Sequence, residues 1–405
     1  MRTRKTQYSV AYLSLVVALF STGCSKAIKI PSPVPADTLT QNVYTINSTG
    51  MASPGVILTA PFPFPADPMT AVPGLLLIMD QDGRVLNEQF TVGSAFDFIR
   101  WKINGQTRYS YIENDPNAYR PVGLPYFAGY VVITDSNLNQ LQQFNFIPAG
   151  PGPFPPGQAL DVHDFIMISD SHYIAMATYP KYVTNIPAYL NAASSVLVDV
   201  PIVEEVNNGS VVWYWDPSSD TSFYGASVTG NNFSDSTTIQ DYIHLNAILI
   251  DPTDNNLILS LRSLCQIMKV NRQTGATMWR LGGKNSDFPL FSDQIFLYQH
   301  APALVDSNQT LIIFDDGDPI LRAESRIVEF KLDQVNKAVT GFKSFTIPEK
   351  FSLLMGSVQK MGDEYFIGGG TADYMLEVNY VTGQKIREFL GYLPSYRSYK
   401  YPTSP

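Results

Sequence analysis

A hairpin pattern that recurs along most of the chain limits its possible folds more than any other feature of the sequence. Each copy has an apolar strand, a polar turn that usually contains Gly or Asn, and a second strand. The copies are GLLLIMDQDGRVLNEQF (74–90), GYVVITDSNLNQLQQFNF (129–146), VLVDVPIVEEVNNGSVVWYW (196–215), QIMKVNRQTGATMWRL (266–281), RIVEFKLDQVNKAVTGFKSF (326–345) and YMLEVNYVTGQKIREFL (374–390). So many similar units at a regular spacing indicate a repeat architecture built from strands.

The number of hairpins predicts the architecture. Six copies of this hairpin alternate with five of a second one, which are FDFIRWKINGQTRYSYIE (96–113), three segments that each begin with His, and LLMGSVQKMGDEYFIGGG (353–370). Together they predict an all-β six-bladed β-propeller with a short N-terminal tether, in which closure of the ring completes the last blade. The predicted organisation is a signal peptide over residues 1–24, a tether and a leading strand over 25–70, and the propeller over 71–405.

The three His-led segments share one position in the repeat. They are HDFIMISDSHYIAMATY from His163, HLNAILIDPTDNNLILSLR from His244 and HAPALVDSNQTLIIFDD from His300, in a chain with only four histidines. Equivalent points of successive blades surround one axis, so we expect the three imidazoles to face a shared funnel. The alternative is that each is an ordinary hydrogen-bonded residue at the end of a strand.

Two polar residues near His244 narrow the chemistry of this predicted site. Arg262 follows His244 by eighteen residues, at the far end of the returning strand, and Asn246 lies on the same strand face as His244. A guanidinium beside several imidazoles opposes a metal cation and suits an oxyanion such as sulfate or phosphate. We therefore expect Arg262 to bind an anion, Asn246 to add a neutral donor to the substrate, and no metal ion or cofactor.

The remaining His and Cys residues have simpler interpretations. His172 falls in the turn SDSHY and is predicted to be a solvent-exposed turn residue. Cys265 is the only cysteine after residue 24, so it cannot form an intramolecular disulfide or a Cys-rich zinc site, and we expect a small buried side chain.

Composition excludes some partners. The net charge is −9 and the pI is about 4.9, which argues against nucleic acid because phosphate binding needs a surface rich in Lys and Arg. Hydrophobic residues make up 45% of the chain and charged residues 16%, which is enough apolar material for a large core.

The N-terminus has the features of an export signal. A basic start (MRTRKTQ) precedes a short apolar run and the small-residue segment STGC, which ends at Cys24. This pattern resembles a bacterial lipoprotein signal, in which Cys24 is lipidated. We expect an exported lipoprotein that is periplasmic or attached to the outer membrane, and that contacts the membrane by its lipid anchor only.

The order of the motifs resembles one known family. HDF, D-x-x-HLN, LS-x-R, TGATMWRLGG, QHA, IIFDDGD and SRIVEFKLD are similar to segments of the bacterial arylsulfate sulfotransferases, most strongly between about residues 160 and 335. This resemblance implies a six-bladed propeller that moves a sulfuryl group from an aryl sulfate to a phenol. It also implies that His300 is the covalent nucleophile and that His163, His244 and Arg262 support it. Better-known members carry an additional N-terminal β-domain and a disulfide near the catalytic histidine, and this sequence has neither.

Two other functions remain open on the sequence alone. One is a non-catalytic surface propeller that binds a glycan or a protein, and the other is an aryl sulfate hydrolase that uses the same residues. Asp164, Asp315 and Asp316 either orient the imidazoles or are turn residues at strand ends. No recognisable motif identifies the natural donor and acceptor, the aryl-binding residues or the oligomeric state.

Overall fold

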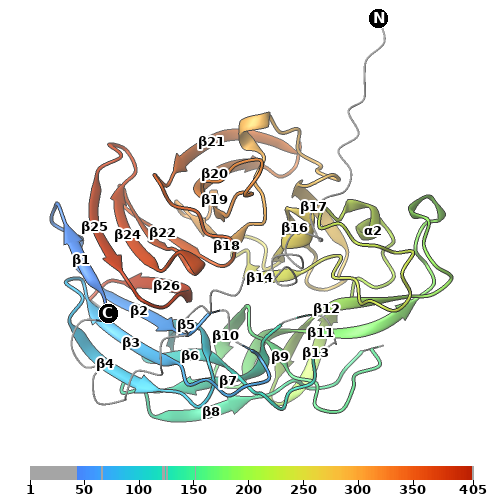
Figure 1. Cartoon of the computed structure of the whole chain (residues 1–405), viewed down its shortest axis with the longest axis horizontal. Coiled ribbons are helices and arrows are strands. Elements are labelled where there is room, and N and C mark those ends of the chain that lie inside the picture. The colour runs from blue at the N-terminus through green and yellow to red at the C-terminus, as the bar shows by residue number, and fades with distance from the viewer. Residues whose placement is uncertain (1–42, 65–66, 121–123, 125, 151, 404–405) are drawn as a thin grey trace, which may run out of the picture.

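Six antiparallel sheets surround a central axis and form a closed ring (Figure 1). The computed structural model describes residues 43–64, 67–120, 124, 126–150 and 152–403. The predicted six-bladed β-propeller is therefore confirmed. The predicted signal peptide and Cys24 lie outside the described residues.

Each blade runs from an inner strand at the axis to an outer strand at the rim. In chain order, and from the inner to the outer strand, the blades are: β26 (Ser395–Tyr401), β2 (Val56–Pro61), β3 (Leu75–Asp80), β4 (Val85–Phe90); β5 (Ala95–Ile103), β6 (Gln106–Asn114), β7 (Ala128–Thr134), β8 (Gln140–Phe144); β10 (Phe165–Ser169), β11 (His172–Val183), β12 (Val196–Asn207), β13 (Ser210–Trp215); β14 (Leu245–Ile250), β15 (Leu257–Leu261), β16 (Gln266–Val270), β17 (Thr277–Gly282); β18 (His300–Val305), β19 (Thr310–Asp315), β20 (Arg326–Asp333), β21 (Ala338–Thr346); and β22 (Ser357–Met361), β23 (Glu364–Gly368), β24 (Tyr374–Asn379), β25 (Lys385–Leu390).

The two ends of the described chain close the ring in two places. The C-terminal strand β26 pairs with β2, so that Leu58 lies opposite Tyr399. Strand β1 (Thr45–Ser48) adds a fifth strand outside β25, and the short strand β9 (Leu160–Asp161) pairs with β7. The predicted leading segment therefore holds two strands that belong to blades, and the ring begins before residue 71.

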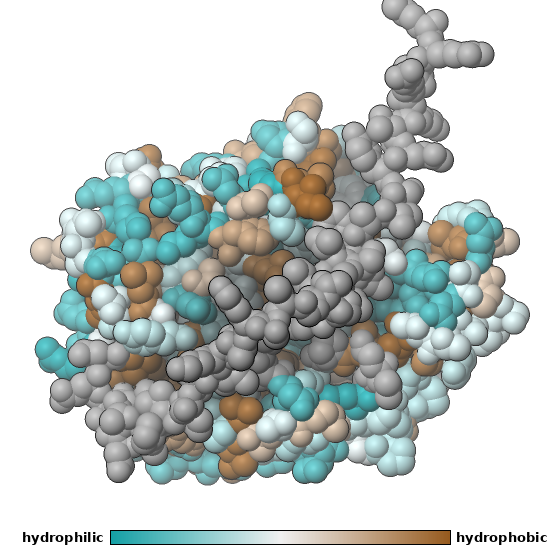
Figure 2. Space-filling model, viewed as in Figure 1, coloured by the Kyte–Doolittle hydropathy of each residue, from teal (hydrophilic) through white to brown (hydrophobic). Residues whose placement is uncertain are grey.

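The strands are apolar because neighbouring blades cover both faces of a blade. Leu75–Met79 of β3 is buried throughout, and so is all of Leu257–Leu261 in β15. Apolar and polar groups are interspersed on the face of the ring in view (Figure 2). Among the described residues, the helices are short and lie in connections between strands: α2 (Ser222–Ala226), η2 (Ala188–Leu190), η3 (Arg262–Leu264), η4 (Ser292–Gln294) and η5 (Gly370–Ala372). None of the helices in the described part of the chain is long and apolar enough to cross a membrane.

Candidate active site

The three histidines of the repeat lie at the starts of the inner strands of three consecutive blades. His300 is the first residue of β18, His244 directly precedes β14, and His163 lies two residues before β10. The imidazoles of His163 and His244 are in edge contact, with 5.1 Å between ring centroids. Tyr396 of β26 contacts the rings of both His163 and His300, at 5.6 and 6.4 Å. The repeat position thus brings the three side chains to the same end of the axis.

Each of these histidines pairs its Nδ1 atom with a carboxylate. The Nδ1–oxygen distances are 2.5 Å from His163 to Asp161, 2.9 Å from His244 to Asp241, and 2.8 Å from His300 to Asp316. A carboxylate that accepts the Nδ1 proton leaves the lone pair on Nε2. All three rings are therefore oriented alike, with Nε2 as the basic nitrogen.

A contact at Nε2 also supports this tautomer of His300. The backbone N–H of Met355 donates to His300 Nε2 over 3.3 Å, which requires a lone pair on Nε2 and places the proton on Nδ1. Burial lowers the pKa of His300 well below its usual value, and the charge of Arg262 lowers it further. His300 is thus a neutral imidazole, whose side chain is only 3% exposed.

A small polar cavity adjoins two of the histidines. Its lining comprises Tyr126, Asp161, His163, Thr178, Asp199, Pro201, Asp241, His244 and Leu245. Its volume of about 10 Å³ has room for one water molecule, so an aryl sulfate enters only if the lining side chains move. Burial lowers the pKa of His244, against the opposing charge of Asp241.

Tyr126 connects to this cavity through hydrogen bonds. Its hydroxyl lies 2.7 Å from His244 Nδ1 and also donates to the Asp241 carboxylate, and its ring contacts those of His163 and His244. Sequence reasoning missed Tyr126 and the carboxylates of Asp161 and Asp241. The carboxylates had a signal, since an Asp stands two residues before His163 and three before His244.

The returning strand brings Arg262 to the same end as His244. The Arg262 N–H donates to the carbonyl of His244 over 2.8 Å, and the guanidinium lies over the Tyr298 ring at 5.0 Å. Arg262 Nε is buried and has no hydrogen-bond partner among the described residues. The charge of Arg262 lowers the pKa of both His244 and His300. An unpaired guanidinium donor beside neutral imidazoles is suited to hold the oxygens of an anion.

Asn246 makes a contact that the sequence did not predict. Its side chain is fully buried, and its Nδ2 donates over 2.8 Å to the carbonyl of Gln299, the residue before His300. One N–H of this amide therefore positions the His300 segment, and a contact of Asn246 with the substrate stays a prediction.

The three aspartates that the sequence left unassigned have separate roles. Asp316 orients His300, as described above. Asp315 instead accepts hydrogen bonds from Arg322 and Arg326 and from the Leu297 N–H, which fixes the loops beside His300. Asp164 touches no imidazole.

Asp164 belongs to a buried ion cluster at the axis. Arg397 of β26 lies 3.1 Å from Asp97 and 3.3 Å from Asp164, and it also donates to the Asn246 carbonyl. Burial raises the pKa of Asp164 to about 7, with Arg397 acting in the opposite direction. The cluster joins three inner strands below the histidines.

Cys265 is buried, as the sequence predicted, and its sulfur accepts the Tyr298 N–H at 3.3 Å. Burial raises the pKa of its thiol to about 12, so the sulfur stays protonated. The thiol thus supports the segment that leads to His300.

The prediction for His172 was wrong. His172 begins β11, its Nε2 lies 2.6 Å from Glu205 of the neighbouring strand, and its side chain is only 25% exposed. Arg272 also holds Glu205, at 2.7 Å, so the contact with Glu205 keeps the His172 ring against the sheet and partly buried.

No group of three or more His, Cys, Asp or Glu side chains within the described residues is placed to hold a metal ion. At the axis, each of the three histidines instead pairs its Nδ1 with a carboxylate and keeps the lone pair on Nε2.

The fold and the site define a β-propeller with a histidine- and arginine-lined axial site. The chain belongs to the arylsulfotransferase (ASST) family, whose family model matches residues 153–390, more than half of the chain. That match covers all three histidines and Arg262. No curated protein matches the chain.

Solved structures with a similar overall arrangement share little sequence with the chain. A protein of unknown function from Bacteroides caccae is 11% identical, with 86% of this chain and 99% of that chain covered and a TM-score of 0.45. A periplasmic gluconolactonase from Pseudomonas aeruginosa is 10% identical, with the same coverage and the same TM-score. A putative 6-phosphogluconolactonase from Bacteroides fragilis is 10% identical, with 88% and 100% covered and a TM-score of 0.41.

Proposed function

We propose that this member of the arylsulfotransferase family transfers a sulfuryl group from an aryl sulfate to a phenol through a sulfohistidine on His300. One observation carries the proposal: three imidazoles, each held by a carboxylate at Nδ1, meet at one end of the axis together with Arg262, whose Nε has no partner among the described residues. Membership of the family supports the same class of reaction.

The first half-reaction uses the lone pair of His300. Nε2 gives up its hydrogen bond from the Met355 N–H and attacks the sulfur of the aryl sulfate, the N–S bond forms, and the bond from sulfur to the aryl oxygen breaks. The departing aryl oxide takes a proton from His163 or His244 in its doubly protonated form, which is left with its remaining proton on Nδ1. Because the pKa of His300 is depressed, its imidazole stays neutral and nucleophilic around pH 7. The Asp316 carboxylate stabilises the positive charge that develops on the ring.

The second half-reaction reverses these steps with a new phenol. Its oxygen attacks the sulfur, the N–S bond breaks, and His163 or His244 accepts the phenolic proton. A positioned acid–base group of this kind contributes roughly 100- to 10,000-fold to the rate. Arg262 binds the equatorial sulfuryl oxygens in both steps, where charge accumulates in a loose transition state.

Two assays separate the proposal from its rivals. Purified protein is given a nitrophenyl sulfate, and nitrophenol release is followed with and without added phenol. A transferase releases nitrophenol faster with phenol and forms phenyl sulfate. Release of inorganic sulfate at an unchanged rate indicates a hydrolase instead, and no release with any aryl sulfate indicates a binding propeller.

We also propose that the protein is an exported lipoprotein anchored through Cys24. The support is the sequence of the first 24 residues, with a basic start, an apolar run and STGC. Cys24→Ala removes the acylated residue, so the protein moves from the membrane fraction to the soluble envelope fraction. An unchanged distribution contradicts the proposal.

A further inference from the structure

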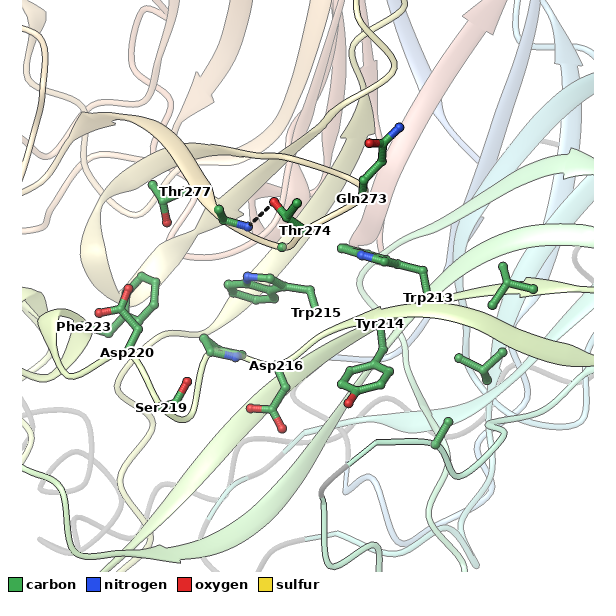
Figure 3. Close-up of a pocket in the computed structure, with 16 residues that line it drawn as sticks. Trp213, Tyr214, Trp215, Asp216, Ser219, Asp220, Phe223, Gln273, Thr274 and Thr277 are labelled. Atoms are coloured by element: carbon green, nitrogen blue, oxygen red, sulfur yellow. Dashed lines mark hydrogen bonds between the residues drawn. The ribbon is translucent and has the colours of Figure 1, made fainter.

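A groove lies at the rim of the ring, away from the histidines. It has a volume of about 680 Å³ and runs between the outer strand β13 of one blade and the turn at 273–277 of the next (Figure 3). None of its lining residues lines the cavity beside His163 and His244. A volume of this size is typical of a small-molecule site.

Tryptophans dominate one wall of this rim groove. The chain has four tryptophans, and Trp213 and Trp215 are two residues apart on β13, so both point to the same face. Their Cα atoms are about 7 Å apart along the strand, which lets one ligand contact both indoles. Figure 3 shows both rings directed toward the turn that carries Gln273 and Thr274.

The indole N–H groups of the rim groove lack partners. Trp101 Nε1 donates to Ser110, and Trp279 Nε1 donates to Gln334. Within the described part of the chain, Trp213 and Trp215 have no such acceptor, and neither Nε1 is among the buried atoms that lack a partner, so both nitrogens reach the surface although Trp215 as a whole is only 5% exposed. These two donors are therefore available to a ligand.

The other lining groups determine the polarity of that ligand. Asp216, Ser219, Asp220, Gln273 and Thr274 contribute carboxylate, hydroxyl and amide groups. No Lys, Arg or His occurs among the sixteen residues that line the groove. Asp220 is ion-paired with Arg280 at 3.5 Å, just outside the lining, whereas no cation pairs with Asp216 among the described residues. The unpaired Asp216 carboxylate disfavours an anionic ligand such as an aryl sulfate or an acidic glycan.

We infer that the rim groove binds an uncharged oligosaccharide. The aliphatic faces of sugar rings pack on the Trp213 ring, and sugar hydroxyls accept from the free indole N–H groups and donate to the Asp216 and Asp220 carboxylates. This alternation of apolar faces and hydroxyls matches a lining that is both aromatic and polar. The inference does not depend on the sulfuryl-transfer chemistry at the axis.

Isothermal titration calorimetry on the full chain tests the inference. The ligands are the hexasaccharides of cellulose, starch, xylan and mannan, with an oligogalacturonide as the charged comparison. We expect at least one neutral hexasaccharide to bind, and Trp213→Ala to weaken that binding at least about tenfold. Trp101→Phe, which changes a tryptophan outside the groove, leaves the affinity unchanged. Sulfuryl transfer is the same in Trp213→Ala as in the wild type.

A second variant controls for misfolding of Trp213→Ala. Trp213→Phe keeps an aromatic ring but removes the N–H and part of the stacking surface, so it also weakens binding if the contact is real. The inference is overturned if no neutral hexasaccharide binds at about 10 mM, where even millimolar affinity is detectable. Equal affinity for the oligogalacturonide, displacement of the sugar by phenol, or unaltered binding in both Trp213 variants overturns it as well.

Discussion

Replacement of Asp316 by Asn tests how the carboxylate controls the nucleophile. The Asp316 oxygen lies 2.8 Å from His300 Nδ1, and the two side chains are 1% and 3% exposed, so water cannot replace the lost contact. If the new amide turns its NH₂ toward Nδ1, the ring proton must move to Nε2. Nε2 then loses its lone pair and meets the Met355 N–H donor to donor.

The expected loss follows from these contacts. A hydrogen bond to a charged group contributes about 1.5–3 kcal/mol, which corresponds to roughly 10- to 100-fold in rate. The wrong tautomer adds to this, so we expect kcat/KM for the donor half-reaction to fall by about 100- to 10,000-fold in Asp316→Asn. The assay is nitrophenol release from a nitrophenyl sulfate, with a thermal melt to confirm folding.

A neighbouring carboxylate provides the matched control. Asp315 is equally buried but holds Arg322 and Arg326 rather than a histidine. Asp315→Asn therefore lowers the melting temperature, while its effect on the donor half-reaction is at least about tenfold smaller than that of Asp316→Asn. A folded Asp316→Asn variant with a rate within about threefold of the wild type would refute the tautomer argument.

Four further outcomes are expected. Arg262→Lys keeps the charge but loses the planar guanidinium, so transfer falls by about 100- to 1,000-fold with folding unchanged. A loss up to about threefold smaller than that in Arg262→Ala is also consistent with this role, whereas wild-type activity contradicts it. Because burial and Arg262 lower the pKa of His300, sulfohistidine formation from a nitrophenyl sulfate, whose nitrophenolate leaves without a proton, shows no acid limb down to about pH 6, and an acid limb near pH 6.5 contradicts this. The same lowered pKa makes His300 contribute stability at neutral pH that is lost as the pH falls below about 6.5 toward the folded-state pKa, which urea titrations at several pH values measure. Arg397→Leu leaves Asp97 and Asp164 without their cation and lowers the free energy of unfolding by about 3–5 kcal/mol; a change below about 1 kcal/mol shows that the ion cluster is not structural.

Hairpin repetition was sufficient to predict the ring and the end at which the histidines meet. The reason is geometric, since a residue at one position of a repeat has the same position in every blade. His163, His244 and His300 therefore occupy equivalent places, and Arg262 follows because its strand is hydrogen-bonded to the one that begins after His244. Closure by β26 and β2 was also predictable from the uneven number of hairpins.

Contacts across the axis were not predictable in the same way. Tyr396 reaches the site from the last strand, and Tyr126 reaches it from a loop of another blade, at sequence distances that no local pattern encodes. Asn246 was assigned to the substrate from its strand face alone, and nothing local predicted that one N–H of its amide donates to the carbonyl of Gln299 in the next blade. The pairing of His172 with Glu205 likewise depends on a neighbouring strand.

Intact-mass analysis after incubation with an aryl sulfate alone tests the central claim, that His300 carries the sulfuryl group between donor and acceptor. The wild type is expected to gain one sulfuryl group, located on the peptide that contains His300 and removed when phenol is added. The adduct is expected to be absent from His300→Asn, which keeps a polar side chain of similar size without the nucleophilic nitrogen. An adduct that persists in His300→Asn, or one found on a different residue of the wild type, contradicts the account.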